Sequence, residues 1–409
     1  MATDRPVFWP EIRALLLMAM LVFLYTIGIG ILNGIDAVDF DQRRILGHVH
    51  GGTLGWLTLA VFAASLWLFG ESRAPGSNER SVIRVLTGLA MIAFPAYVAA
   101  FSLSYGYSRP ILGSVSVIAI AGFFAWVVYR ARGQDLGVPQ LGFIAALGTS
   151  ITGGVLGVLW GMKVASGNNW LPSGGEDAHP ATMVVGFLIP VALSMAEWAF
   201  FFPRPPKATR AGQIQMVFPF LGGVCLMFAL LLDIVPLAPL AILLEVVGVV
   251  IFFVRMFPHF RALNLFEATP GRHGLMSALA IVFVIGLAQF WIIKYEGDFD
   301  LVPTNQLLGL DHAQFIGGMT NAIFAMLMLA TVPGAKGGRW DQVVFLMVNV
   351  GIIGFAAGLL FDVKMLKHTF VPIMGIGLLI GLGLYAYRLL PELFESEGRE
   401  EPGVAGSRA

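Results

Sequence analysis

Five of the seven histidines stand where apolar segments begin. The stretch HVHGGTLGW puts His48 and His50 against an apolar run long enough to cross a bilayer, and further runs begin at His179, His312 and His368. Polar residues inside membrane segments are costly and often mark functional sites. Because imidazole binds haem iron and copper, the sequence predicts a metal site among these residues. Interfacial hydrogen bonding is the alternative for any one of them.

The spacing of the histidines suggests an internal repeat. From His50 to His179 is 129 residues, and from His179 to His312 is 133, close to one third of the chain. Glycine follows within about two turns in all three segments, and it would let a neighbouring helix or a flat macrocycle approach the backbone, although helix packing alone also uses it. These glycines are Gly51, Gly52, Gly55, Gly186, Gly317 and Gly318. We predict three repeats of four helices, with equivalent positions on helices 2, 6 and 10.

His48 and His50 are predicted to serve different sites. Two positions along an α-helix are rotated by about 200° from one another. The two imidazoles therefore face opposite sides of one helix.

The elements that must position these side chains are membrane-spanning helices. Hydrophobic residues make up 57% of the 409-residue chain and charged residues only 12%, well below the share in an average soluble domain. Apolar stretches of about 20 residues, the length that crosses the hydrocarbon, lie near 14–34, 50–70, 83–104, 111–130, 141–165, 180–202, 213–232, 236–256, 274–293, 312–332, 342–360 and 369–389. The predicted fold class is an all-α integral membrane protein of twelve transmembrane helices. Residues 1–392 form one domain, and 393–409 form a disordered cytoplasmic tail.

Basic residues in the loops predict the orientation. Most of them fall in alternate connections and ahead of the first helix, which places both termini in the cytoplasm of a multi-pass protein of the cell inner (plasma) membrane. All five histidines at helix starts then lie on the outer side. The outer connections also hold basic residues that violate the bias, namely Arg43, Arg44, Lys294, Lys364 and Lys367.

Composition excludes several classes of partner and cofactor. The 25 basic residues balance the 25 acidic residues without a basic run, so membrane lipid and not nucleic acid is the expected surrounding. The single cysteine, Cys225, excludes disulfides, cysteine-bound clusters and covalent haem attachment. His259 and His273 share an inner connection with several arginines, and we interpret it as a solvated loop that faces lipid headgroups.

The helix pattern, with histidines on helices 2, 6 and 10, resembles subunit I of the haem-copper oxidase superfamily. The segment HVHGGTLGWLTLAVF is similar to helix 2 of its C-family oxidases and nitric oxide reductases. DHAQFIGGMTNAIFAML resembles the late histidine segment of the NnrS family, haem- and copper-containing membrane proteins linked to nitric oxide stress. The resemblance covers the whole hydrophobic pattern and rests on three short motifs.

The resemblance implies a set of cofactors. In the oxidases, helices 2 and 10 each supply a histidine to a six-coordinate haem, which implies His48 or His50 together with His312. Helix 6 supplies a copper ligand, which corresponds to His179. The implied cofactors are one or two b-type haems, with copper as a further candidate. The oxidases also carry a His-His pair around helix 7 and an H-x-H on helix 10, and this sequence has neither, so its set of copper ligands is incomplete.

Charged residues supply the predicted surroundings of such a haem. The carboxylates near the histidines are candidate acceptors for the second ring nitrogen, and they are Asp41, Glu176, Asp177 and Asp311. The haem propionates would emerge at the level of four basic residues, Arg43, Arg44, Lys364 and Lys367. The alternative for these four is pairing with nearby aspartates.

Two carboxylates lie deeper in the apolar segments. Glu245 falls near the centre of helix 8, and Glu197 falls toward the inner half of helix 6. Buried ionisable groups in a bilayer usually mark ion or proton paths, so both are candidates for a proton path. A protonated Glu245 that hydrogen-bonds across helices is the alternative.

The favoured functional hypothesis is a haem-binding membrane redox protein that handles electrons, O2 or nitric oxide near the periplasmic face. It would be a candidate oxidoreductase with a cytochrome c or quinol as electron donor. A multi-pass transporter is one alternative, because internal repeats and interrupted helices are also transporter traits. A haem-free scaffold with the same helix plan is another. The recurrence of histidine at one depth on equivalent helices favours the redox hypothesis.

Overall fold

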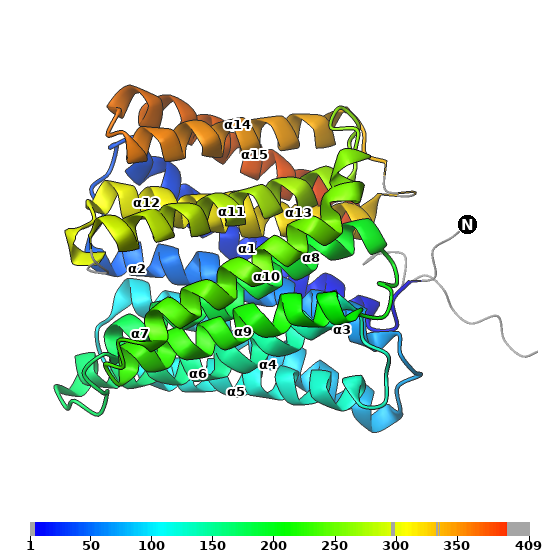
Figure 1. The fold of residues 1–409 in the computed structure, drawn as a ribbon, viewed down its shortest axis with the longest axis horizontal. Coiled ribbons are helices and arrows are strands. Elements are labelled where there is room, and N and C mark those ends of the chain that lie inside the picture. The colour runs from blue at the N-terminus through cyan, green and yellow to red at the C-terminus, as the bar shows by residue number, and fades with distance from the viewer. Residues whose placement is uncertain (1–4, 296–298, 333, 335, 391–409) are drawn as a thin grey trace, which may run out of the picture.

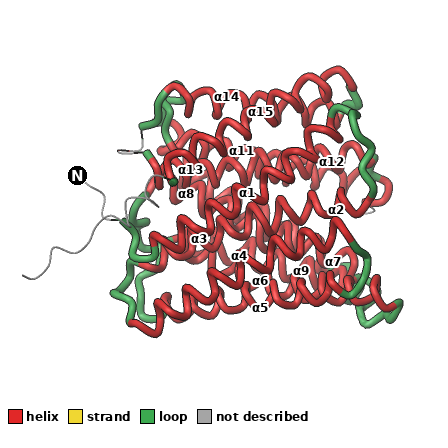
Figure 2. Tube along the Cα trace, turned by 180° about the vertical axis from the view of Figure 1, so that it is seen from behind, coloured by secondary structure: helices red, strands yellow, loops and turns green. Residues whose placement is uncertain are grey.

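The computed structural model describes residues 5–295, 299–332, 334 and 336–390. Within these ranges, twelve helices are long and apolar enough to cross a membrane, which confirms the predicted number. The helices lie side by side along one common direction, and the loops gather at the two ends of the bundle (Figures 1 and 2). The predicted tail, 393–409, lies outside the described residues.

Nine of the twelve spans are uninterrupted α-helices. They are α1 (Trp9–Gly34), α4 (Ser77–Leu103), α5 (Ser108–Ala131), α6 (Val138–Ser166), α9 (Arg210–Leu231), α10 (Leu237–Arg261), α11 (Pro270–Lys294), α14 (Arg339–Leu360) and α15 (Lys364–Leu389). A short 3-10 turn, η3 (Phe299–Leu301), precedes the tenth span.

The other three spans each contain a π-helical segment between two α-helices. Span 2 consists of α2 (Gln42–His50), η1 (Gly51–Thr58) and α3 (Leu59–Gly70). Span 6 consists of α7 (Gly175–Ala181), η2 (Thr182–Leu188) and α8 (Ile189–Phe201), and span 10 of α12 (Thr304–His312), η4 (Ala313–Thr320) and α13 (Asn321–Thr331). The π-helical segments begin at Gly51, Thr182 and Ala313, so each begins 131 residues after the one before. Segments of this kind are rare and frequently lie at functional sites.

The three composite spans form the centre of the bundle. Their most apolar windows are 89%, 72% and 83% buried, whereas no other span exceeds 56%. Across the centre, Trp56 of span 2 donates to Thr320 Oγ1 of span 10 at 3.1 Å, and Trp67 packs edge-on against Trp198 of span 6 at 5.6 Å. Because protein surrounds these spans, they are apolar on all sides and show no single hydrophobic face.

A glycine occupies the fifth position of every π-helical segment, at Gly55, Gly186 and Gly317. A Cβ atom on Gly55 would overlap Val22 of α1, and one on Gly186 would lie 3.0 Å from Thr149 of α6. Each central span therefore packs closely against the span that precedes it in the chain.

The histidines lie inside their helices. The four helices that carry the five histidines begin four to eight residues earlier, at Gln42, Gly175, Thr304 and Lys364, so the prediction that the histidines open them is wrong. The first turns are polar and therefore invisible to a hydropathy window. In span 2, Asp41 caps the helix by accepting from the backbone N–H of Arg44 at 3.0 Å. We call the end of the bundle at which α2, α7 and α12 begin the histidine end, and α1 begins at the opposite end (Figure 1).

Candidate functional site

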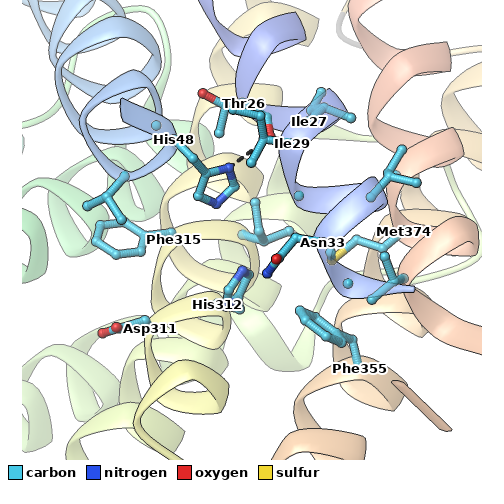
Figure 3. Close-up of a pocket in the computed structure, with 18 of the residues that line it drawn as sticks. Thr26, Ile27, Ile29, Asn33, His48, Asp311, His312, Phe315, Phe355 and Met374 are labelled. Atoms are coloured by element: carbon cyan, nitrogen blue, oxygen red, sulfur yellow. Dashed lines mark hydrogen bonds between the residues drawn. The ribbon is translucent and has the colours of Figure 1, made fainter. Parts of the chain in front are cut away.

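A cavity of about 230 Å³ lies at the histidine end between spans 1, 2, 10, 11 and 12. His48 and His312 point toward one another in this first cavity from facing helices (Figure 3). Their ring centroids are 6.4 Å apart and their planes are inclined by 33°. The remaining wall is mostly apolar and includes Phe315, Phe355 and Met374. The chain thus holds two imidazoles in an apolar pocket.

Backbone carbonyls determine the tautomer of both imidazole rings. His48 Nδ1 lies 2.9 Å from the carbonyl oxygen of Thr26, and His312 Nδ1 lies 2.7 Å from that of Leu308. A carbonyl oxygen only accepts, so Nδ1 of each ring carries the proton and donates it. In the neutral ring, Nε2 then keeps its lone pair, and this is the form of imidazole that binds a metal.

The separation of the two rings matches that of two ligands on one metal ion. An imidazole nitrogen binds a metal at about 2.0 Å. The centre of a five-membered ring with bonds of about 1.33 Å lies about 1.1 Å from its atoms. Two imidazoles on opposite sides of one metal ion therefore have centroids about 6.3 Å apart. The observed 6.4 Å agrees with this arrangement.

A second cavity, of about 300 Å³, contains His50 and His179. His50 Nδ1 lies 2.8 Å from the carbonyl oxygen of Leu46, and His179 Nδ1 lies 2.7 Å from that of Gly153. By the same argument, Nε2 of each ring keeps its lone pair. The prediction that His48 and His50 face opposite sides of one helix is confirmed, because each lines a different cavity.

The four histidines occupy only two positions relative to the π-helical segments. His48 and His179 stand three residues before a segment, and each bonds a carbonyl of the preceding span. His50 and His312 stand one residue before a segment, and each bonds the carbonyl four residues back in its own helix. Each cavity combines one histidine of each kind.

Carboxylates do not orient these rings. Backbone carbonyls take all four Nδ1 positions, Asp41 caps α2, and Glu176 binds Lys163 Nζ at 2.5 Å. Asp311 points away from the two imidazoles of the first cavity (Figure 3). The prediction of carboxylate acceptors on the second nitrogen is therefore wrong. For His48 and His179, the central helix packs so closely against the preceding span that a backbone carbonyl of that span accepts the Nδ1 proton.

The fifth histidine at a helix start, His368, belongs to an ionic cluster away from the other four. Its Nε2 lies 2.9 Å from Asp36 Oδ2, and Asp36 also binds Lys367 at 2.6 Å and Lys364 at 3.4 Å. Lys367 lines the first cavity as well. The two lysines that were candidates for haem propionates are thus found in ion pairs with an aspartate.

The two arginines near the start of span 2 lie in a similar setting. Arg43 donates from Nη2 to Asp41 Oδ2 at 2.9 Å, and the Arg44 side chain is exposed. The backbone N–H of Arg44, followed by the Arg43 guanidinium, lowers the pKa of the Asp41 carboxyl. Neither arginine lines the two cavities described above.

The Asp36 cluster predicts a pH dependence of stability. Hydrogen bonds from Lys367 and His368 hold the pKa of the Asp36 carboxyl well below its usual value of about 3.9. A carboxyl whose folded pKa is lowered stabilises the folded state above its unfolded pKa, and this contribution is lost as the pH falls toward the folded pKa. We expect Asp36→Asn to lower the thermal unfolding midpoint in detergent by no more than about 2 °C at pH 5–7. The difference should shrink below about pH 4. A difference that grows on acidification would contradict this assignment.

The two deep carboxylates have different surroundings. Glu197 is buried and binds Arg255 through both carboxylate oxygens, at 2.9 and 3.0 Å, and Gln215 donates to it at 3.1 Å. Glu245 is also buried, and within the described residues its Oε1 atom has no hydrogen-bond partner. Glu197 is therefore one half of a buried ion pair, whereas Glu245 keeps the features expected of a protonatable group in a membrane.

His273 is a buried residue, so its assignment to a solvated loop is wrong. It lies in α11 with no exposed surface, and its Nδ1 is 2.8 Å from Asn321 Oδ1. Asn321 Nδ2 in turn donates to Asn349 Oδ1 at 2.9 Å. α11 begins at Pro270, earlier than the apolar stretch, and this start carries His273 into the bundle. His259 is exposed, as predicted, but it lies in the last turn of α10 and not in a loop.

Sequence reasoning missed Arg109, near the start of α5. Its side chain is only 4% exposed and lies over the rings of Phe101 and Tyr105, 4.3 and 4.4 Å from their centroids. Phe101 stacks on His50 with ring centroids 3.8 Å apart. The sequence did contain a signal for Arg109, because it is a basic residue that directly precedes the apolar stretch 111–130 on the predicted outer side.

The histidines come together as pairs and not as larger clusters. Among the residues that the structure describes, no group of three or more His, Cys, Asp or Glu side chains surrounds one metal position. Comparison with known proteins finds no family model that matches the chain and no curated protein that is similar to it in sequence.

Proposed function

We propose that this protein is a haem-binding membrane redox protein in which His48 and His312 are the two axial ligands of a b-type haem. The observation that carries this proposal is the spacing of the two rings, 6.4 Å between centroids, with both Nε2 lone pairs unused. The apolar wall of the cavity suits a macrocycle. A bound haem would supply one-electron chemistry, and its protein ligands would set its potential.

We also propose that the chain is built from three four-helix repeats, in the manner of subunit I of the haem-copper oxidases. Three features support this plan: the constant 131-residue spacing of the π-helical segments, the glycine at the fifth position of each, and the central placement of spans 2, 6 and 10. Under this plan, His50 and His312 are equivalent residues, and so are His48 and His179.

The proposed role is electron transfer near the periplasmic face. Two imidazole ligands fill both axial positions of a haem and leave none for O2 or nitric oxide. The described residues also lack a group of three metal-binding side chains, so copper is not part of the proposal. Within the first cavity, the chain's own contribution is to hold two imidazoles at a fixed distance and to exclude water with Phe315, Phe355 and Met374.

The test is cofactor analysis of the purified full chain. Iron, copper and extractable haem are measured per chain, with absorbance spectra before and after reduction. We expect at least one non-covalent b-type haem per chain with a low-spin spectrum, and no change in that spectrum on adding carbon monoxide or nitric oxide. Folded protein that contains no haem after expression with excess haem would overturn the proposal and leave the transporter and scaffold alternatives.

A further inference from the structure

The second cavity repeats the ligand arrangement of the first. In the first cavity, His312 stands one residue before η4 and His48 stands three residues before η1. In the second cavity, His50 stands one residue before η1 and His179 stands three residues before η2. His50 corresponds to His312, and His179 corresponds to His48. Each pair of equivalent residues also makes the same kind of backbone hydrogen bond, which leaves the lone pair of Nε2 free on every ring.

The third interface between central spans has no such pair. The same 131-residue register places Ala181 one residue before η2 and Leu310 three residues before η4. Neither side chain can bind a metal. The pattern therefore predicts two sites in this chain and excludes a third of the same kind.

The walls of the second cavity hold its two imidazoles in place. His50 stacks on Phe101, and the edge of Tyr97 packs against it with ring centroids 5.5 Å apart. Against His179, a Cβ atom on Gly157 would lie 2.6 Å from the ring, so glycine is needed for the ring to occupy its position. Trp160 packs edge-on to His179 at 6.0 Å. Such packing limits the rotation of both rings.

A buried cation, Arg109, lies over Phe101, the ring that stacks on His50. Arg109 donates from Nη2 to the carbonyl oxygen of Phe101 at 2.9 Å, and its Nε atom has no partner among the described residues. No carboxylate of the described residues forms an ion pair with it. A buried guanidinium without a counter-ion is costly, and a carboxylate from a ligand would supply both the missing charge and the missing acceptor.

The two cavities share a wall. Val49 and Thr53 of span 2, with Asp311 and Phe315 of span 10, line both of them. Groups bound in the two cavities would be separated only by these side chains. This adjacency suits the transfer of one electron between two redox centres.

We propose that His50 and His179 are the axial ligands of a second b-type haem, and that Arg109 binds one of its propionates. This inference rests on the proposed function, because it uses the same ligand chemistry. It adds a second centre, places it between spans 2 and 6, and gives the chain two adjacent haems.

The test compares the full-length wild-type protein with His179→Ala. We expect two haems per chain in the wild type and two one-electron steps in a redox titration. In His179→Ala, the haem of the second cavity should be lost or become five-coordinate and bind carbon monoxide, so that only one low-spin haem and one wild-type step remain. His368→Ala, which changes a histidine outside both cavities, is the matched control and should keep two haems.

The outcomes separate the two proposals. One haem in the wild type that His179→Ala leaves unchanged would overturn the second site and keep the first. No haem in any folded protein would overturn both. If His179→Ala is not recovered, His179→Met keeps a ligand for iron and should raise the midpoint potential of one of the two steps. Two unshifted steps would overturn the assignment of His179.

The proposed contact between Arg109 and a haem propionate is tested with Arg109→Gln. Removing a positive charge beside a haem favours its oxidised form, so the midpoint potential of the step that His179→Ala removes or shifts should fall while two haems are retained. The other step should move less. An unchanged potential in both steps would overturn the role of Arg109.

Discussion

Purified His312→Ala protein is expected to lose the whole low-spin absorbance of the haem proposed for the first cavity while it still inserts into membranes. Under the proposed assignment, the substitution removes one of the two imidazoles that would hold the iron and leaves only His48. A haem held by one imidazole is five-coordinate and binds carbon monoxide, whereas a haem held by two is not open to it. The measurement is the reduced spectrum with and without carbon monoxide, normalised to protein.

The control for this prediction is His259→Ala. His259 is exposed near the end of α10 and lines neither cavity. It packs on Phe201 with ring centroids 4.8 Å apart. Its substitution should leave haem content and spectra as in the wild type. A wild-type low-spin spectrum in His312→Ala would remove His312 from the ligand set, whatever the total haem content.

The sequence was sufficient to predict the parts of this site that depend on periodicity. Apolar length gave twelve spans, and the helical repeat placed His48 and His50 on opposite sides of one helix. The spacing near one third of the chain singled out the three spans that form the centre. These features are properties of one helix, or of the order of helices, and need no knowledge of tertiary contacts.

The parts that sequence reasoning missed depend on which helix lies against which. The acceptor for His48 Nδ1 is a carbonyl of α1, and that for His179 Nδ1 is a carbonyl of α6. The sequence shows only the carboxylates that lie near the histidines along the chain. Helix packing instead places backbone carbonyls of a neighbouring span against Nδ1 of His48 and His179. Arg109 was missed for a similar reason, because its contact with Phe101 joins two different spans.

Helix starts were the least accurate element of the prediction. The polar first turn of α2 contains Gln42, Arg43 and Arg44, and it is stabilised by the cap at Asp41 instead of by burial. In α11 the early start turned a predicted loop histidine, His273, into a buried one. A hydropathy window detects the hydrocarbon-crossing part of a helix, whereas the chemistry here lies in the polar turn before it.

Arg255→Ala is expected to destabilise the folded protein by about 3–5 kcal/mol, the range for breaking a buried ion pair. The Glu197 side chain is 1% exposed, and Arg255 supplies two of its hydrogen bonds. Removing the guanidinium leaves a buried carboxylate with Gln215 as its remaining donor. The measurement is the free energy of unfolding in mixed micelles. Arg84→Ala removes an arginine whose side chain is 72% exposed and which lies 3.5 Å from Glu11, so it is the control and should cost less than about 1 kcal/mol.

The double variant Glu197→Leu/Arg255→Met distinguishes an ion pair from a proton path. Replacing both partners by apolar residues of similar size removes the unpaired charge, so the double variant should be more stable than Arg255→Ala alone. The two sites should then show a coupling energy of about 0.5–3 kcal/mol. If Glu197 instead carried a proton and were neutral at rest, Arg255→Ala would cost little and the two substitutions would be additive. Additive effects would therefore return Glu197, beside Glu245, to the set of candidate proton carriers.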